Sequence, residues 1–337
     1  MTDAKTVLVT GGAGYIGSHA AFALLDAGFR VVVLDDLSTG RRELVPDEAE
    51  FHQGQVQDYT QVEGVLKQYD IGSVMHFAGS IVVPESVENP IKYYRNNTAA
   101  SCILLEACVA LGVANFIFSS TAAVYGTPTE LPVREDSPTV PINPYGWSKL
   151  MTEQVIRDTA AAHPLKYGAL RYFNVAGADA ELRTGQATPE ATHLIKVAAE
   201  AITGKRAGVQ VFGDDYATPD GTGVRDYIHV SDLVAAHVVL LEHLMAGGES
   251  VTLNCGYGHG FSVLEVLDTT ERVSGGSVNR SIAARRAGDP AELVSDCSRL
   301  HATIDWKPRF DDLAAIISSA LAWERVMDEK IALNAPS

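Results

Sequence analysis

The fold of this chain is decided by one glycine-rich segment, Gly11-Gly12-Ala13-Gly14-Tyr15-Ile16-Gly17. It follows a short apolar run at residues 6–10 and opens a helical pattern at residues 15–27 that Gly28 ends. Only glycine lets a backbone turn this sharply and approach a phosphate without a Cβ clash. The amides and the positive end of the following helix favour anions. Strand, turn and helix together predict a dinucleotide site; the alternative is a glycine turn that serves only tight packing.

An acidic residue follows this motif where a dinucleotide ribose would need it. Asp35 comes directly after the next expected strand, residues 31–34, and lies 18 residues beyond Gly17. A carboxylate at this point accepts hydrogen bonds from a ribose 2′-hydroxyl and repels a 2′-phosphate. Asp36 adds a second negative charge, so the expected cofactor is NAD rather than NADP.

Short β-branched runs alternate with longer helical patterns through the first half of the chain. Strands that are apolar on both faces and separated by helices are typical of a parallel sheet covered on both sides. Right-handed crossovers make this a Rossmann-type, doubly wound α/β fold. The expected strands are residues 6–10, 31–34, 73–77, 116–119 and 166–172, and the expected helices are residues 15–27, 59–68, 94–111 and 144–162.

Beyond Asn174 the pattern changes to shorter strands and longer loops, including one at residues 214–225. Long loops in compact domains are often functional. We expect residues 1–175 to form the Rossmann domain, joined again by residues of about 225–255. Residues 176–337 would form mainly a smaller α+β substrate domain across a cleft. Its expected helices are residues 192–203, 231–245, 262–273 and 313–328, and its expected strands are residues 209–212, 251–254 and 279–283.

Composition and charge exclude several classes of function. The 337 residues are 46% hydrophobic and 20% charged, which can fill a core and excludes wholesale disorder. A net charge of −16 repels polyanions, so neither nucleic acid nor an anionic membrane is an expected partner. There is no bilayer-length apolar run, no signal-peptide pattern and no metal-binding spacing of Cys or His, so we expect a cytoplasmic protein with reduced thiols and no catalytic metal.

A tyrosine and a lysine lie four residues apart at the start of the helix expected after Pro144. Tyr145 and Lys149 therefore share one helical face. A free tyrosine is a poor base at neutral pH, but a neighbouring ammonium and a cationic nicotinamide ring favour the phenolate. The segment Ser119-Ser120-Thr121 ends the strand expected opposite and can supply a hydroxyl to a substrate alcohol. The pattern predicts a proton-transfer site; an ordinary Tyr and Lys at a helix start is the alternative.

These motifs resemble the extended short-chain dehydrogenase/reductase superfamily. The resemblance also includes His76-Phe77-Ala78-Gly79, Ser119-Ser120-Thr121-Ala122-Ala123-Val124-Tyr125-Gly126 and Arg171-Tyr172-Phe173-Asn174. Within the superfamily, two later segments resemble the UDP-glucose 4-epimerase family: Gly221-Thr222-Gly223-Val224-Arg225-Asp226-Tyr227-Ile228-His229-Val230 and Arg285-Arg286-Ala287-Gly288-Asp289-Pro290. The similarity runs from about Thr6 to Trp306, which is nearly the whole chain.

The resemblance implies reversible epimerisation at C4 of a UDP-hexose, UDP-glucose or UDP-galactose, through transient hydride transfer to bound NAD and a 4-keto sugar. Tyr145 would take the 4-hydroxyl proton, Thr121 would share that hydroxyl's hydrogen bond, and Lys149 would bind the nicotinamide ribose. The resemblance also implies a homodimer, joined through the helices at residues 94–111 and 144–162. Their small and apolar residues would equally suit packing within one chain.

The family pattern also implies which residues surround the two ligands. For the cofactor they are Gly11, Gly14, Tyr15, Ile16, Gly17, Asp35, Asp36, Gln55, Val56, Phe77, Ala78, Gly79, Asn96, Tyr145, Lys149 and Tyr172. For the substrate they are Thr121, Tyr145, Asn174, His193, Leu194, Phe212, Arg225, Arg286, Asp289 and Leu293. Arginine suits a diphosphate because its planar fork grips phosphate oxygens in pairs. Surface salt bridges are the alternative for Arg225 and Arg286, and a buried or capping histidine is the alternative for His193.

Several positions depart from the family pattern or separate it from related activities. Ile81 stands where a lysine is expected, and Gln55 stands where an aspartate would bind the adenine amino group. Dehydratases carry Asp-Glu where this chain has Ala122 and Ala123, which excludes the proton transfers of 4,6-dehydration. In the family pattern Leu293 falls at the position that controls access for N-acetylated sugars, so UDP-N-acetylglucosamine is an alternative substrate; a core residue is the alternative for Leu293. A UDP-uronate epimerase and a non-catalytic NAD-binding regulator are the remaining alternatives.

Overall fold

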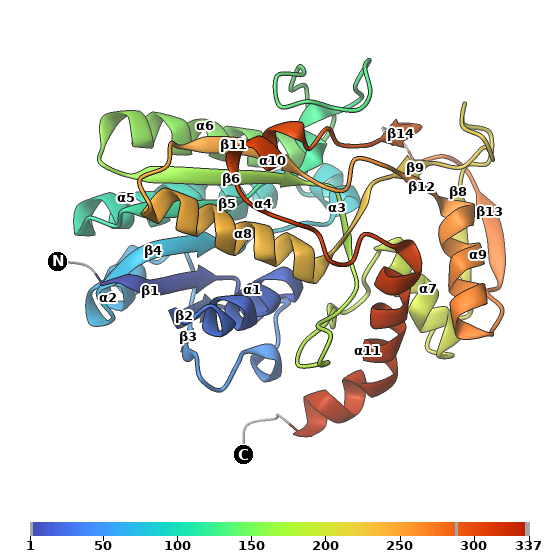
Figure 1. The fold of residues 1–337 in the computed structure, drawn as a ribbon, viewed down its shortest axis with the longest axis horizontal. Helices are drawn as coiled ribbons and strands as arrows, with labels where there is room; N and C mark the ends of the chain where they lie inside the picture. Colours follow the sequence, from blue (N-terminus) through green and yellow to red (C-terminus); the bar gives the residue numbers. More distant parts are fainter. Residues whose placement is uncertain (1–2, 287–288, 334–337) are drawn as a thin grey trace.

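A computed structural model describes residues 3–286 and 289–333 of the chain. Within these residues the central sheet is parallel throughout and has the strand order β11-β6-β5-β4-β1-β2-β3 (Figure 1). The order runs in opposite directions from β1, as in a doubly wound sheet. The predicted fold class is therefore confirmed. The strands are β1 (Asp3–Thr10), β2 (Arg30–Asp35), β3 (Glu50–Gln53), β4 (Ile71–His76), β5 (Asn115–Ser119), β6 (Lys166–Tyr172) and β11 (Val251–Cys255).

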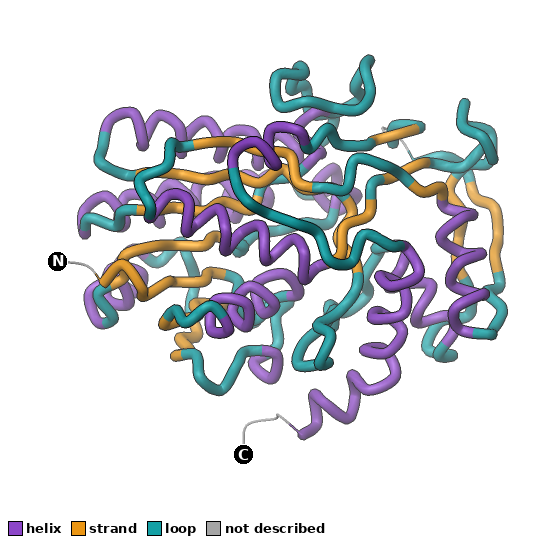
Figure 2. Tube along the Cα trace, viewed as in Figure 1, coloured by secondary structure: helices purple, strands orange, loops and turns teal. Residues whose placement is uncertain are grey.

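Alternate residues of each strand fill two different hydrophobic layers, because successive strand side chains point to opposite faces. In β1, Val7 and Val9 belong to one buried cluster and Leu8 to the other. The first layer is covered by α1 (Tyr15–Asp26) and α8 (Val230–Met245). The second is covered by α2 (Tyr59–Gln68), α5 (Ala100–Leu111) and α6 (Pro144–Ala162). Figure 2 shows helices on both sides of the strands.

Most of the other elements that follow β6 form a smaller group beside the carboxyl ends of the strands (Figure 1). Three helices pack together there: α7 (Leu194–Ile202), α9 (Val263–Ser274) and α11 (Leu313–Leu333). Three short sheets accompany them: β7 (Asn174–Ala176) with β10 (Tyr227–His229), β8 (Val209–Phe212) with β13 (Arg280–Ala283), and β9 (Val224–Arg225) between β12 (Phe261–Ser262) and β14 (Glu292–Leu293). The division of the chain into two domains stays a prediction.

The start of α6 is fixed by its sequence, and this fixes where Tyr145 lies. Asn143 is the N-cap residue, and its side-chain oxygen accepts a hydrogen bond from the Gly146 amide at 2.9 Å. Pro144 occupies the first helical position, where its missing N–H costs nothing. Tyr145 is therefore held in the first turn of α6, and Lys149 follows one turn later on the same face.

Some elements differ from those expected from the sequence. The strand β3 was not predicted, because its residues Glu-Phe-His-Gln form a polar edge strand with no apolar run. The expected helix at residues 94–111 begins with a π-helical turn, Tyr94–Ala99, and follows α3 (Val83–Glu88) and α4 (Pro90–Tyr93). The helix expected from residue 192 begins at Leu194, because His193 has an extended backbone. Among the described residues, no helix is both long and apolar enough to cross a bilayer.

Candidate active site

One cleft lies between the carboxyl ends of the sheet strands and the smaller group of elements. Every residue predicted to contact the cofactor or the substrate lines this cleft, from Gly11 on the sheet side to Leu293 on the other. These positions lie far apart in the sequence and meet only through the fold. Their contacts with ligands stay predictions. Gly288, part of one of the family motifs, lies outside the described residues.

The glycine turn brings three backbone segments into close contact. Gly11 has a φ of 72°, and a Cβ there would lie 2.6 Å from the Ala78 amide nitrogen. A Cβ at Gly17 would lie 2.1 Å from the Gly11 carbonyl oxygen. Neither position can carry a larger residue without moving backbone. The turn therefore sets the first turn of α1 against the end of β1, where amides that lack an intrahelical partner face the cleft.

Asp35 connects the end of β2 to this turn. Its carboxylate accepts hydrogen bonds from the backbone amides of Ala13 at 2.9 Å and Leu37 at 2.8 Å. Burial raises the pKa of the Asp35 carboxyl, and these two amides lower it. A carboxylate has about four acceptor positions, so it can still accept from ribose hydroxyls. Amide donors beside an acidic residue fit a dinucleotide with a free 2′-hydroxyl.

Tyr145 and Lys149 lie on the cleft beside the end of β5. The Tyr145 side chain is buried, which raises the pKa of its hydroxyl, and the Thr121 hydroxyl lowers it. The Lys149 ammonium donates to the Ser119 carbonyl at 2.9 Å and lies 4.9 Å from the centre of the Phe118 ring. Burial lowers the pKa of Lys149 to about 8, and Glu153 acts in the opposite direction. The arrangement places a phenol, a hydroxyl and an ammonium where a proton could be moved.

The π-helical turn carries a residue that the sequence analysis did not identify. Asn97 is buried; its side-chain oxygen accepts from the Ser80 amide at 2.7 Å, and its side-chain nitrogen donates to the Ser148 hydroxyl at 2.9 Å. A Cβ at Gly79 would lie 2.9 Å from the Asn97 side-chain oxygen. Asn97 thus joins the loop after β4 to α6. Two adjacent asparagines inside a helical pattern, where asparagine is a poor helix former, were the available signal.

A buried ion pair behind the cleft was also missed. Glu153 lies one turn beyond Lys149 and accepts from the Arg171 guanidinium at 2.9 and 2.6 Å. It also accepts from the Ser120 hydroxyl, next to Thr121. Arg171 further donates to the Tyr125 hydroxyl at 3.0 Å. This network ties α6 and β6 to the strand end that carries Thr121. The four-residue spacing of Tyr145, Lys149 and Glu153 puts Glu153 on the same helical face but does not specify Arg171 as its partner.

On the opposite wall, each of the two predicted diphosphate arginines contacts another residue predicted to bind the substrate. Arg225 forms an ion pair with Asp289 and donates to the Val224 carbonyl at 2.8 Å. The Arg286 guanidinium lies 3.9 Å from the centre of the Phe212 ring. The cleft thus presents two arginines and an aromatic ring together, with Asn174 on the same lining.

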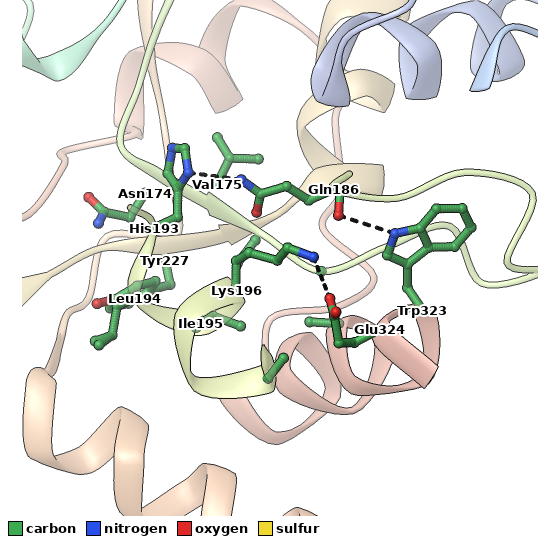
Figure 3. Close-up of a pocket in the computed structure, with 14 residues that line it drawn as sticks. Asn174, Val175, Gln186, His193, Leu194, Ile195, Lys196, Tyr227, Trp323 and Glu324 are labelled. Carbon is green, nitrogen blue, oxygen red and sulfur yellow. Dashed lines mark hydrogen bonds and ion pairs between the residues drawn. The ribbon is translucent and has the colours of Figure 1, made fainter. Parts of the chain in front are cut away.

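His193 and Leu194 lie at the start of α7, in front of a small internal cavity (Figure 3). The His193 ring nitrogen Nδ1 lies 2.8 Å from the Gln186 side-chain nitrogen. Trp323 of α11 donates to the Gln186 carbonyl at 3.2 Å, and Figure 3 also shows the buried ion pair of Lys196 with Glu324. The polar side chains Gln186, His193, Lys196 and Glu324 on the cavity lining are thus already paired with protein groups, which hold the start of α7 in place.

Both departures from the family pattern lie on the cleft. Ile81 is exposed there and leaves this part of the lining apolar. The Gln55 side-chain oxygen accepts from the Gln57 side chain at 2.6 Å. In the part of the chain that the structure describes, no group of three or more His, Cys, Asp or Glu residues is placed to hold a metal ion.

Comparison with known proteins relates the chain to epimerases along nearly its whole length. Residues 7–256 match the model of the NAD dependent epimerase/dehydratase family. The UDP-glucose 4-epimerase of Azospirillum brasilense is 57% identical over 335 residues, which cover 98% of this chain and 96% of that one. The crystal structure of UDP-glucose 4-epimerase from Brucella ovis in complex with NAD has 44% identity and a TM-score of 0.92, covering 94% and 98% of the two chains. The UDP-Glc/GlcNAc 4-epimerase of Campylobacter jejuni has 47% identity and a TM-score of 0.84, covering 95% and 99%.

The buried ion pair yields a stability prediction. Replacing Arg171 by methionine (Arg171→Met) leaves the Glu153 charge buried without its main partner, so we expect a loss of about 3–5 kcal/mol in the free energy of unfolding. Denaturant titration measures it. The matched control is Arg157→Met, because Arg157 is 37% exposed and lies 4.0 Å from the same carboxylate; there we expect a loss within about 1 kcal/mol. Equal losses in the two variants would contradict the assigned role of Arg171.

Proposed function

This chain belongs to the NAD dependent epimerase/dehydratase family, and on that premise we propose that it interconverts UDP-glucose and UDP-galactose by epimerisation at C4 with bound NAD. One observation carries the proposal. The buried Tyr145 phenol, the Thr121 hydroxyl and the Lys149 ammonium line the same cleft as the glycine turn, in a chain closely similar to UDP-glucose 4-epimerases.

The sheet side of the cleft would hold the cofactor. The first-turn amides of α1 would bind its diphosphate, Asp35 a ribose, and Lys149 the nicotinamide ribose. When bound, NAD supplies an acceptor for the C4 hydride and returns that hydride to the sugar. The negative charges of Asp35 and Asp36 disfavour NADP.

Tyr145 would act as the base for the sugar's 4-hydroxyl. Its phenolate takes the hydroxyl proton, with Thr121 holding the same oxygen, and returns the proton when the keto group is reduced. The Lys149 ammonium favours the phenolate. Ala122, which is buried, and Ala123, which is half-buried, follow Thr121 and carry no acid or base, so they offer the sugar no proton donor or acceptor for dehydration.

The opposite wall would hold the UDP group. Arg225 and Arg286 are the cations that would bind its diphosphate. Phe212, whose ring lies under the Arg286 guanidinium, would contact the uracil base. Asn174, His193, Leu194 and Asp289 complete this side. Firm binding of UDP together with a loosely held hexose would let the 4-keto sugar turn and present its other face.

Leu293 supports a second candidate substrate, UDP-N-acetylglucosamine. Leu293 lines the cleft and packs against the cluster that contains Phe173 and Tyr125. Its side chain is smaller than a tyrosine, which leaves room beside the sugar's C2 substituent. The similar structure from Campylobacter jejuni is described as acting on both sugar types.

A substrate panel with a tyrosine variant tests the proposal. We expect the purified protein to convert UDP-galactose to UDP-glucose without net formation of free NADH. Tyr145→Phe should fold normally and lose about 10²–10⁴-fold in kcat, because it lacks the base. Tyr69→Phe is the control: the Tyr69 hydroxyl pairs with His52, and Tyr69 is not part of the cleft lining.

Other outcomes of the panel decide between the alternatives. Bound NAD without turnover of any UDP-sugar would favour a non-catalytic regulator. Turnover of UDP-galactose alone would exclude the N-acetylated substrate, and turnover of UDP-uronates alone would replace the hexose. Near-normal activity of Tyr145→Phe would refute the assigned base.

The pH dependence should follow Lys149. Burial places the pKa of Lys149 at about 8, so its ammonium is present below that pH and is lost as the pH rises through it. We therefore expect kcat/KM to fall above about pH 8. In Lys149→Arg the charge persists at all accessible pH values, so the residual activity should lack this decline. A wild-type profile that stays flat to pH 10 would contradict the prediction.

We also propose that two copies of the chain form a homodimer through α6 and its neighbours. Trp147 and Met151 lie one turn apart on α6 and are 38% and 43% exposed. Val87 and Ile91, on the α3 and α4 helices that pack against α6, are 64% and 70% exposed. An apolar face of this kind is typical of a subunit contact.

Sedimentation velocity at micromolar concentration tests the dimer. We expect the parent to sediment as a dimer and Met151→Glu as a monomer, because the substitution would bury an unpaired carboxylate in the contact. Ile282→Glu is the matched control, since Ile282 is 56% exposed on β13 and should leave the dimer intact. A monomeric parent would refute the proposal.

A further inference from the structure

The segment between β7 and α7 is fastened to the helix that carries the glycine turn. This clamp segment, residues 177–187, lies between α1 and α11 in Figure 1, where it is coloured yellow-green. Its contacts with α1 include hydrogen bonds, an ion pair and a ring contact. The proposed epimerisation assigns no role to these contacts.

Buried hydroxyl groups make the first set of contacts. The Tyr15 hydroxyl donates to the Gly177 carbonyl at 2.7 Å. The hydroxyls of Ser18 and Thr184 are 2.7 Å apart, and both side chains are fully buried. Because Ser18 also donates to the Tyr15 carbonyl at 3.1 Å, it is free to accept from Thr184. Tyr15 and Ser18 both belong to the first turn and a half of α1, directly after the glycine turn.

Arg183 makes the second set at the other end of α1. Its guanidinium donates to Asp26 at 3.0 and 2.9 Å and to Asp179 at 3.1 and 2.8 Å, which joins the clamp segment to the last residue of α1. It also lies 4.7 Å from the centre of the Phe22 ring. The clamp segment is thus attached along nearly the whole length of α1.

The clamp segment is also joined to α11, which packs against α7 behind the other wall of the cleft. The Ala178 amide donates to the Ser319 hydroxyl of α11 at 3.2 Å, and the Gln186 carbonyl accepts from Trp323 (Figure 3). Gln186 itself lines the cleft and contacts His193. One short segment therefore links the wall that would hold the cofactor to the wall that would hold the UDP-sugar.

We propose that the clamp segment keeps the cleft closed on NAD, so that Ser18, Thr184 and Arg183 are positioning residues that determine how slowly the cofactor leaves. Widening the cleft to release a dinucleotide moves α1 away from the opposite wall and breaks these contacts. The inference rests on the proposed use of NAD but needs no sugar chemistry.

The test measures NAD release from the loaded protein without any sugar. Holoenzyme is diluted, and the NAD that appears is captured by an auxiliary dehydrogenase. Thr184→Val keeps the shape of the side chain and removes its hydrogen bond. The net contribution of one hydrogen bond, about 0.5–1.5 kcal/mol, corresponds to roughly 2–12-fold faster release of NAD. Arg183→Met removes the ion pair from a side chain that is 30% exposed, so it tests the clamp even where Thr184→Val folds poorly. We expect the double variant to release NAD faster than either single one.

The matched control is Thr203→Val. The Thr203 hydroxyl donates to the carbonyls of Ala199 and Glu200, in its own helical segment. Thr203→Val therefore makes the same chemical change as Thr184→Val, but away from the clamp segment. We expect its NAD release to equal that of the parent, whatever its thermal midpoint. Release that is unchanged in Arg183→Met and in the double variant overturns the inference. Bound NAD without turnover of UDP-sugars refutes the proposed function instead, and leaves the release measurement valid.

Discussion

The contact between backbone and backbone at the glycine turn is the constraint on which the rest of the site depends. Gly17 can approach the Gly11 carbonyl, and Gly11 the backbone of Ala78, only because neither carries a Cβ. The first contact sets α1 on the end of β1, and the second sets the loop after β4 beside them. Asp35 then joins the end of β2 to the same turn through the Ala13 amide. Three neighbouring strands thus bring their ends to one place, where the proposed function puts the dinucleotide.

A second constraint comes from the charges buried in and behind α6. Taking the Lys149 ammonium out of water is costly, and its pKa falls for that reason. Glu153, one turn away, opposes this effect, but a buried carboxylate needs a partner of its own, which Arg171 provides from β6. The buried lysine, acid and arginine therefore form one arrangement. The reactive groups are held in place by the same contacts that make their burial tolerable.

The sequence predicted the parts of the site that depend on local geometry. The glycine turn, Asp35 at a strand end and the Tyr145–Lys149 spacing each follow from one strand or helix and its neighbours. The π-helical turn at Asn97 was missed, because two adjacent asparagines mark a poor helical stretch without specifying a π-helical turn. The strand β3 escaped because an edge strand needs no apolar run. The pairing of Glu153 with Arg171 depends on how α6 packs on β6, and no spacing within one element specifies it.

The two sides of the cleft differ in the way that the proposed reaction requires. A hydride that returns to the molecule it came from must stay on a cofactor that does not leave between the two transfers. The cofactor side is accordingly built from short backbone contacts, and α1 is fastened by the buried hydroxyls of Ser18 and Thr184. The sugar must instead turn between the two transfers, and directional hydrogen bonds would resist that rotation. Ile81, Ala122 and Leu293 give that part of the lining apolar side chains that make no such bonds. For the proposed reaction, rigidity where the cofactor would bind and few polar contacts where the hexose would turn are thus two halves of one requirement.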